Sequence, residues 1–138
     1  MRLGNVYGPR QDPLGEAGVI AIFCGRVQRE ERPTVYGSGE QTRDYVFVGD
    51  VVGALLAALA NPEATGEFNV GTGRESSVLD IVRELAAHVH ADFDPELAPE
   101  RASDSHGVAR ELAHESSLAL LPPVGELGFA DRQRVVLL

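Results

Sequence analysis

Apolar positions along this chain recur at two alternating spacings, which predict helices and strands in turn. Residues 19–29 repeat apolar positions every three or four residues, the spacing of a helix with one buried face. A second helix is expected over 51–59, with Asp50 as its N-cap and an end before Asn61 and the proline after it. A third helix is expected to begin at Ser77 and to end near residue 90.

Short runs rich in β-branched and aromatic residues lie between these helices and predict strands. The glycine-flanked stretch 37–39 predicts a tight turn. Ser77, with Asp80 three residues later, has the spacing of a capping box, although Asp replaces the usual Glu or Gln. The alternation indicates a mixed α/β layer domain. The expected extended segments are 2–6, 33–36, 44–48, 66–70 and 93–97.

Composition narrows the classes of protein that fit. The chain has 138 residues, enough for one domain with a modest core, and a net charge of −9. That charge argues against nucleic acid and anionic membrane surfaces as partners. No apolar run reaches the roughly 20 residues of a membrane span, and the first residues do not resemble a signal peptide. The single cysteine, Cys24, fits a reducing cytoplasm and is expected to be a buried thiol rather than a nucleophile.

All 12 basic residues are arginines. The absence of lysine excludes, within this chain, a Schiff-base lysine and a Walker A phosphate loop. The glycine-rich stretch 69–73 is therefore interpreted as a strand end and a turn. The spacing of the histidines and of the acidic cluster near Asp92 fits neither zinc nor calcium, so no metal site is expected.

Two residues are candidates for binding phosphate or sugar. Arg43 follows a glycine turn and precedes a strand, and a guanidinium offers a planar set of donors that matches two phosphate oxygens. The alternative is a surface arginine paired with Asp44 or Glu40. Asn5 lies just past a strand end and can both donate and accept hydrogen bonds, although an asparagine there can equally bond its own backbone.

The Arg-x-x-Asn-x-x-Gly-Pro segment at 2–9 and the Gly-turn, Arg-Asp-Tyr segment at 37–45 together resemble the NAD-dependent epimerase/dehydratase family. The resemblance is to UDP-glucose 4-epimerase-like members of the extended short-chain dehydrogenase/reductases, over about residues 2–101. It implies the C-terminal, substrate-binding part of a Rossmann-type α/β fold, without the N-terminal dinucleotide-binding domain. Residues 102–138 are expected to be a divergent tail, disordered or frameshifted.

The resemblance also implies roles for single residues. Asn5 would meet the nucleotide sugar and Arg43 its diphosphate, with Arg101 as a second diphosphate clamp. Thr34 and Tyr36 would contact the uridine, although an edge strand whose tyrosine merely packs is the alternative. Tyr45 would be a further pocket residue or plain core. The segment of Leu3, Gly4 and Val6 would lie near the nicotinamide ring.

For the whole enzyme, the resemblance implies an isomerase that oxidises and reduces a UDP-sugar at C4 with bound NAD, usually as a homodimer. This chain lacks the NAD-binding glycine loop and the Tyr-x-x-x-Lys pair of that family. The expectation is therefore an inactive fragment that contributes UDP-sugar binding and does not bind NAD alone. The alternatives are a non-catalytic nucleotide-sugar-binding module, a fragment of a nucleotide-sugar dehydratase or reductase, and a non-functional truncation product.

Overall fold

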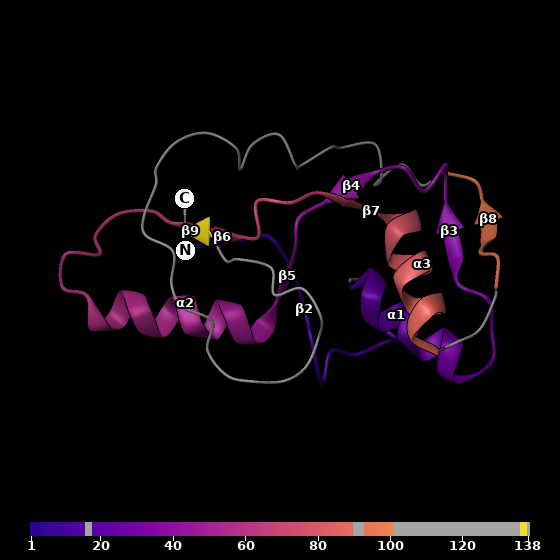
Figure 1. Cartoon of the computed structure of the whole chain (residues 1–138), viewed down its shortest axis with the longest axis horizontal. Helices are drawn as coiled ribbons and strands as arrows, with labels where there is room; N and C mark the ends of the chain where they lie inside the picture. Colours follow the sequence, from indigo (N-terminus) through magenta and orange to yellow (C-terminus); the bar gives the residue numbers. More distant parts are fainter. Residues whose placement is uncertain (16–17, 90–92, 101–135, 138) are drawn as a thin grey trace.

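A computed structural model describes residues 1–15, 18–89, 93–100 and 136–137. Helices and strands alternate along these residues, as the apolar spacing predicts (Figure 1). The three helices are α1 (Val19–Gln28), α2 (Val48–Ala60) and α3 (Val78–Val89). The strands are β1 (Arg2–Leu3), β2 (Asn5–Tyr7), β3 (Thr34–Tyr36), β4 (Thr42–Arg43), β5 (Tyr45–Phe47), β6 (Asn69–Gly71), β7 (Ser76–Ser77), β8 (Glu96–Ala98) and β9 (Val136–Leu137).

The N-terminal segment changes its partner strand midway. β1 pairs in parallel with β6, and β2 then pairs in parallel with β5. β9 adds to the other edge of β6 in antiparallel orientation. Two further pairs complete the described sheets: β3 with β8 in parallel, and β4 with β7 antiparallel.

One apolar cluster packs α2 on the β2–β5 pair. Val46 and Val70 are almost fully buried and meet Val51 and Ala54 of the helix, with Val6 packed beside them. Burial of such side chains stabilises the fold by about 1.5–3 kcal/mol each.

A second cluster lies at the other end of the described structure, between α1, α3 and β3 (Figure 1). Its buried members are Phe23, Val35, Val78 and Val82. Gly39 closes the turn after β3 with a φ of +72°, and a side chain there would collide with Val35 and with Leu79. The turn therefore needs glycine for both conformation and space.

The two predicted helix starts have different outcomes. At α3 the capping-box prediction is confirmed: Asp80 accepts from the N–H and hydroxyl of Ser77, and the Ser77 hydroxyl accepts from the N–H of Asp80. At α2 the prediction is wrong. The helix begins three residues earlier, at Val48; Phe47 is the N-cap with no side-chain cap bond, and Asp50 lies in the first turn. There its carboxylate still has favourable electrostatics with the helix N-terminus.

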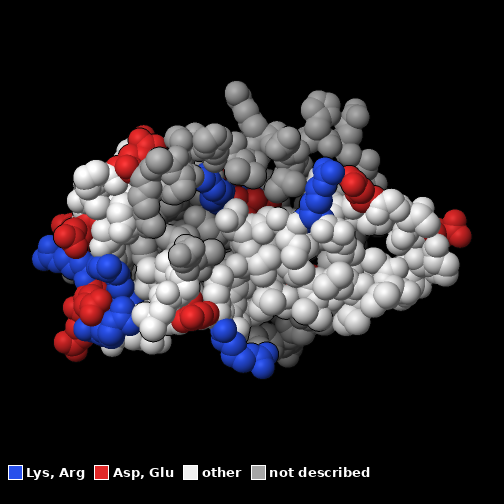
Figure 2. Space-filling model, turned by 180° about the vertical axis from the view of Figure 1, so that it is seen from behind, with Lys and Arg blue, Asp and Glu red and all other residues white. Residues whose placement is uncertain are grey.

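The surface differs between the two ends. On the face shown in Figure 2, charged side chains gather at the end formed by α1, α3 and β3, whereas the surface around α2 is mostly uncharged. α2 leaves five large apolar side chains exposed: Val48, Val52, Leu55, Leu56 and Leu59. Within the described ranges, no helix is long and apolar enough to cross a membrane.

Candidate functional site

The β2–β5 pairing brings the two sequence motifs together. Asn5 is the Cα partner of Tyr45, and the N–H of Asn5 donates to the carbonyl oxygen of Asp44 at 2.7 Å. Asn5 therefore lies beside Asp44, the residue that directly follows Arg43, although Asn5 and Asp44 are 39 positions apart in the sequence. The parallel pairing of β2 with β5 thus brings Asn5 close to the segment that contains Arg43.

Side chains of the paired strands β2 and β5 point alternately to two opposite faces. Val6 and Val46 are paired across the strands and pack into the core under α2. Because successive side chains of a strand point to opposite faces, Asn5 and Tyr45 lie on the face away from that core. Asn5 is exposed, whereas Tyr45 is 8% exposed, so the alternative of a packed tyrosine at position 45 fits its burial.

Arg43 ends β4, where it pairs with Ser76 of β7, and it is half-buried. Its Nη1 donates to the carbonyl oxygen of Thr42 at 2.8 Å. Burial raises the pKa of the Tyr45 hydroxyl, and the positive charge of Arg43 opposes that rise. The guanidinium is thus within electrostatic reach of the Tyr45 phenol.

The predicted uridine-contacting strand, β3, lies toward the other end of Figure 1. It pairs with β8 along one edge, and within the described residues no strand pairs with its other edge. The carbonyl oxygen of Tyr36 accepts from Nε2 of Gln41 at 3.1 Å, which ties β3 to the turn before β4. The structure therefore connects β3 to Arg43 through a short, bonded turn.

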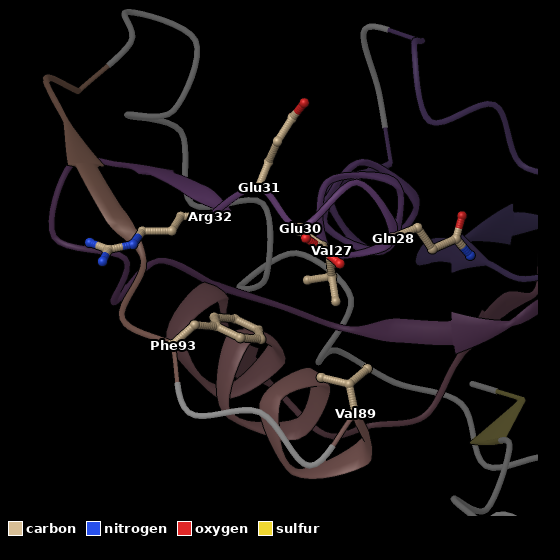
Figure 3. A pocket seen from close by; sticks show the side chains of 7 residues that line it. All are labelled: Val27, Gln28, Glu30, Glu31, Arg32, Val89 and Phe93. Atoms are coloured by element: carbon tan, nitrogen blue, oxygen red, sulfur yellow. The ribbon is translucent and has the colours of Figure 1, made fainter.

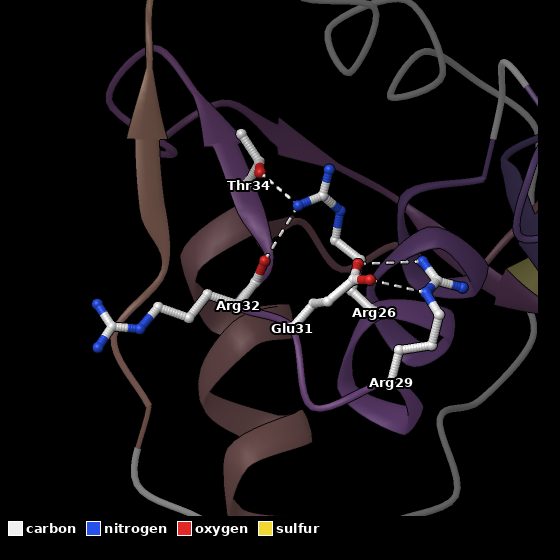
Figure 4. Close-up of polar contacts among 5 residues, drawn as sticks. All are labelled: Arg26, Arg29, Glu31, Arg32 and Thr34. Carbon is white, nitrogen blue, oxygen red and sulfur yellow. Dashed lines mark hydrogen bonds and ion pairs between the residues drawn. The ribbon is translucent and has the colours of Figure 1, made fainter.

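Sequence reasoning did not single out Arg26, which contacts β3 directly. Its Nη1 donates to the hydroxyl of Thr34 at 2.8 Å and to the carbonyl oxygen of Arg32 at 3.2 Å. Figure 4 shows the guanidinium reaching β3 from the side away from β8. Its only sequence signal is a basic residue in the last turn of α1, which is common at helix ends.

The three residues predicted to lie near the nicotinamide ring differ in exposure and contacts. Leu3 is exposed, Val6 packs into the core, and the N–H of Gly4 donates to the carbonyl oxygen of Val70. The nicotinamide contact of these three residues therefore stays a prediction. Arg101 and the predicted tail up to residue 135 lie outside the described residues.

A cavity of about 460 Å³ opens elsewhere, between the end of α1 and the end of α3 (Figure 3). Val27, Val89 and Phe93 form its apolar lining, and none of the predicted site residues borders it. Figure 3 shows the side chains of Glu31 and Arg32 pointing away from Phe93. This cavity is not the site that the motifs predict.

Cys24 and the acidic and histidine side chains show no reactive arrangement in the part of the chain that is described. Burial raises the pKa of the Cys24 thiol, which lowers the thiolate fraction at neutral pH. No group of three or more His, Cys, Asp or Glu side chains suited to a metal ion occurs among the described residues.

Known proteins with similar sequences belong to the family that the two motifs resemble. The model of the NAD dependent epimerase/dehydratase family matches residues 1–71. The UDP-glucose 4-epimerase of Mycolicibacterium smegmatis is 48% identical over 101 residues, which are 72% of this chain and 32% of that protein.

Two solved structures of UDP-glucose 4-epimerases are similar to this chain in both fold and sequence. The UDP-glucose 4-epimerase of Thermotoga maritima, solved with UDP-glucose, has a TM-score of 0.68 and 48% identity over 75% of this chain and 33% of its own. The Thermus thermophilus UDP-glucose 4-epimerase, solved with NAD, has a TM-score of 0.63 and 44% identity over 73% of this chain and 33% of its own.

These structures are Rossmann-type epimerases, and the chain spans about a third of the length of the relatives it matches. Their fold confirms the predicted α/β class. The family match covers the β2–β5 register that unites Asn5 with the Arg43 segment. The chain belongs to the NAD dependent epimerase/dehydratase family.

Proposed function

We propose that this chain binds the nucleoside-diphosphate part of a UDP-sugar, as the substrate-binding portion of a UDP-glucose 4-epimerase-like enzyme. The observation that carries the proposal is the bond from the Asn5 N–H to the Asp44 carbonyl, which brings both motifs to one place. Arg43 supplies a guanidinium for the diphosphate, and the Asn5 amide supplies donors and acceptors for phosphate or sugar.

The uridine would lie along β3. Thr34 and Tyr36 belong to this strand, whose second edge has no strand partner in the described ranges. A strand edge without a strand partner offers backbone groups to a flat base beside the Arg26 contact, and Tyr36 adds a ring. The UDP-glucose complex of the Thermotoga maritima relative supports UDP-sugar as the ligand class.

The chain alone is proposed to lack epimerase turnover. Its 138 residues contain no lysine, so the Tyr-x-x-x-Lys proton pair expected for this chemistry is absent from it. NAD, present in the Thermus thermophilus structure, would supply the hydride chemistry in a complete enzyme. Incubating this chain with NAD and UDP-galactose should therefore yield no UDP-glucose, and turnover would refute this part of the proposal.

Binding itself is tested by titrating the chain with UDP in a calorimeter. Arg43→Ala removes charge-assisted hydrogen bonds worth about 1.5–3 kcal/mol and should weaken UDP binding by roughly 10- to 150-fold. Arg83→Ala is the matched control, because Arg83 is an exposed arginine paired with Asp80. Equal UDP affinity in the wild type and Arg43→Ala would contradict the proposed role of Arg43.

A further inference from the structure

Asp44 uses its side chain to hold a turn that is distant in sequence. Its Oδ1 accepts from the Thr72 hydroxyl at 2.6 Å, and Oδ2 accepts from the Gly73 N–H at 2.9 Å. The Thr72 N–H is shared between the two oxygens, at 2.9 Å from each. Thr72 is 6% exposed and is the buried polar side chain of the described residues, so its bonds to Asp44 are partly shielded from water, whereas the bond from the Gly73 N–H is exposed.

The same residue uses its main chain to hold β2, because its carbonyl oxygen accepts the N–H of Asn5 at 2.7 Å. Asp44 thus joins three parts of the chain: the turn after β6, the first residue of β2, and Arg43 immediately before it. Side-chain and main-chain bonds of one residue therefore fix the relative placement of the two proposed ligand-binding residues.

Two glycines leave room for this arrangement. A Cβ at Gly71 would collide with Oδ2 of Asp44, and a Cβ at Gly4 would lie 2.9 Å from its carbonyl oxygen. Neither glycine has the positive φ that favours glycine, so space and not conformation requires them. The aspartate and both glycines form one packed unit.

We infer that Asp44 is a positioning residue of the nucleoside-diphosphate site. Its carboxylate is hydrogen-bonded to Thr72 and Gly73, and this anchoring holds Asn5 and Arg43 where both can bind the diphosphate. This inference rests on the proposed function. A carboxylate suits the place, because the hydroxyl and N–H of Thr72 and the N–H of Gly73 all donate to it. An asparagine would direct an NH₂ group at one of these donors.

The positioning is tested without ligand by amide hydrogen exchange of the full chain, with Asp44→Asn as the variant. Exchange at Thr72, Gly73 and Asn5 should become at least about tenfold faster relative to Val82 in the core of α3. Asn5 is the decisive amide, since the variant keeps the carbonyl that it bonds. Unchanged relative exchange at Asn5 would overturn the inference.

Asp80→Asn is the matched control, because it removes a carboxylate that bonds Ser77 and Arg83 rather than Thr72, Gly73 or Asn5. It should speed exchange at Ser77 and leave the relative exchange of Asn5 as in the wild type. Acceleration of Asn5 by both variants would show a general loss of stability and would also overturn the inference.

The consequence for binding is tested by NMR titration with UDP and with uridine. Asp44→Asn should weaken UDP binding by about tenfold and change uridine binding by less than about twofold, since the base is proposed to lie on β3. Equal losses for both ligands, or none, would contradict positioning of the diphosphate grip. If the wild type binds neither ligand, the proposed function fails, while the exchange experiment still decides whether Asp44 positions Asn5.

Should Asp44→Asn fail to fold, Thr72→Val provides the second variant. It removes the hydroxyl donor at 2.6 Å and keeps both backbone donors to the carboxylate. The same selective loss of UDP binding is expected at about threefold, and Thr72→Ser, which keeps the hydroxyl, should restore it. A Thr72→Val chain with wild-type UDP binding and wild-type exchange at Asn5 would contradict the inference.

Discussion

The backbone N–H of Asn5 bonds the carbonyl oxygen of Asp44, and its side chain takes no part in that bond. The side chain is exposed on the face of β2 opposite the core cluster of Val46. The backbone N–H of Asn5 therefore contributes to the fold, whereas its side-chain carboxamide is exposed and is proposed to bind the ligand.

Asn5→Ala should consequently change binding far more than stability. The backbone bond to Asp44 is kept, so the free energy of unfolding in urea should change by less than about 0.5 kcal/mol. The UDP affinity should fall by about 3- to 10-fold through the loss of one or two hydrogen bonds. Asn61→Ala, which removes an exposed side-chain bond to the Glu63 N–H after α2, is the control with unchanged affinity. A large loss of stability without loss of affinity would contradict the assignment.

Thr34→Val tests the contact of Arg26 with β3. Valine keeps the shape of threonine but removes the hydroxyl that accepts from Arg26 Nη1 at 2.8 Å. The free energy of unfolding should fall by about 1 kcal/mol, partly offset by the preference of valine for strands. Thr65→Val is the control, because Thr65 is exposed and outside the helices and strands. Equal stability changes in the two variants would show that the Arg26 bond contributes nothing measurable.

Glu30→Gly should stabilise the protein. Glu30 follows the C-cap of α1 with a φ of 60°, and its N–H donates to Val27 while that of Glu31 donates to Arg26. This is a Schellman motif, in which glycine avoids the steric cost of the left-handed conformation. Because glycine also loses more backbone entropy on folding, the net gain in unfolding free energy should be about 0.5–1 kcal/mol.

Urea unfolding of the Glu30→Gly chain measures this gain. Glu63→Gly provides the comparison, since Glu63 has no positive φ and should only lose stability. Destabilisation by both substitutions would refute the account of strain at Glu30.

Asp80 should make stability depend on pH in the acid range. Hydrogen bonds from Ser77 hold the pKa of its carboxyl below the ordinary value of 3.8. A lowered folded-state pKa means that the stabilisation is fully present above the unfolded-state pKa and is lost as pH falls through the folded-state value.

The measurement compares the unfolding free energies of wild type and Asp80→Asn at pH 7 and below pH 4. The difference should be about 0.5–1 kcal/mol at pH 7, because the carboxyl is half-exposed, and should shrink steadily below the ordinary pKa of 3.8. A difference that stays constant through the acid range would contradict the assignment.

Local features of the fold were predictable from the sequence, and contacts between distant segments were not. The Ser77–Asp80 cap was found because its partners lie three residues apart. The capping chemistry of Asp50 predicts a helix start there, but α2 begins at Val48, whose side chain is exposed, with Phe47 as N-cap and no side-chain cap bond.

Asp44 illustrates what sequence reasoning misses in the candidate site. The sequence suggests Asp44 only as an ion-pair partner for Arg43, whereas its carboxylate accepts hydrogen bonds from Thr72 and Gly73. No periodicity or spacing rule joins residues that are 28 positions apart. The prediction that 69–73 is a strand end and a turn is confirmed, because β6 ends at Gly71, but the bond of Gly73 to Asp44 depends on the tertiary fold.

The central claim is that Asn5 and Arg43 belong to one site for a nucleoside diphosphate. The most direct measurement is a two-dimensional NMR titration of the chain with UDP, following the side-chain NH₂ of Asn5 and the Nε–H of Arg43. The account predicts that both signals shift and saturate with the same dissociation constant. Shifts confined to Val89 and Phe93 around the apolar cavity, or no shift at either Asn5 or Arg43, would contradict it.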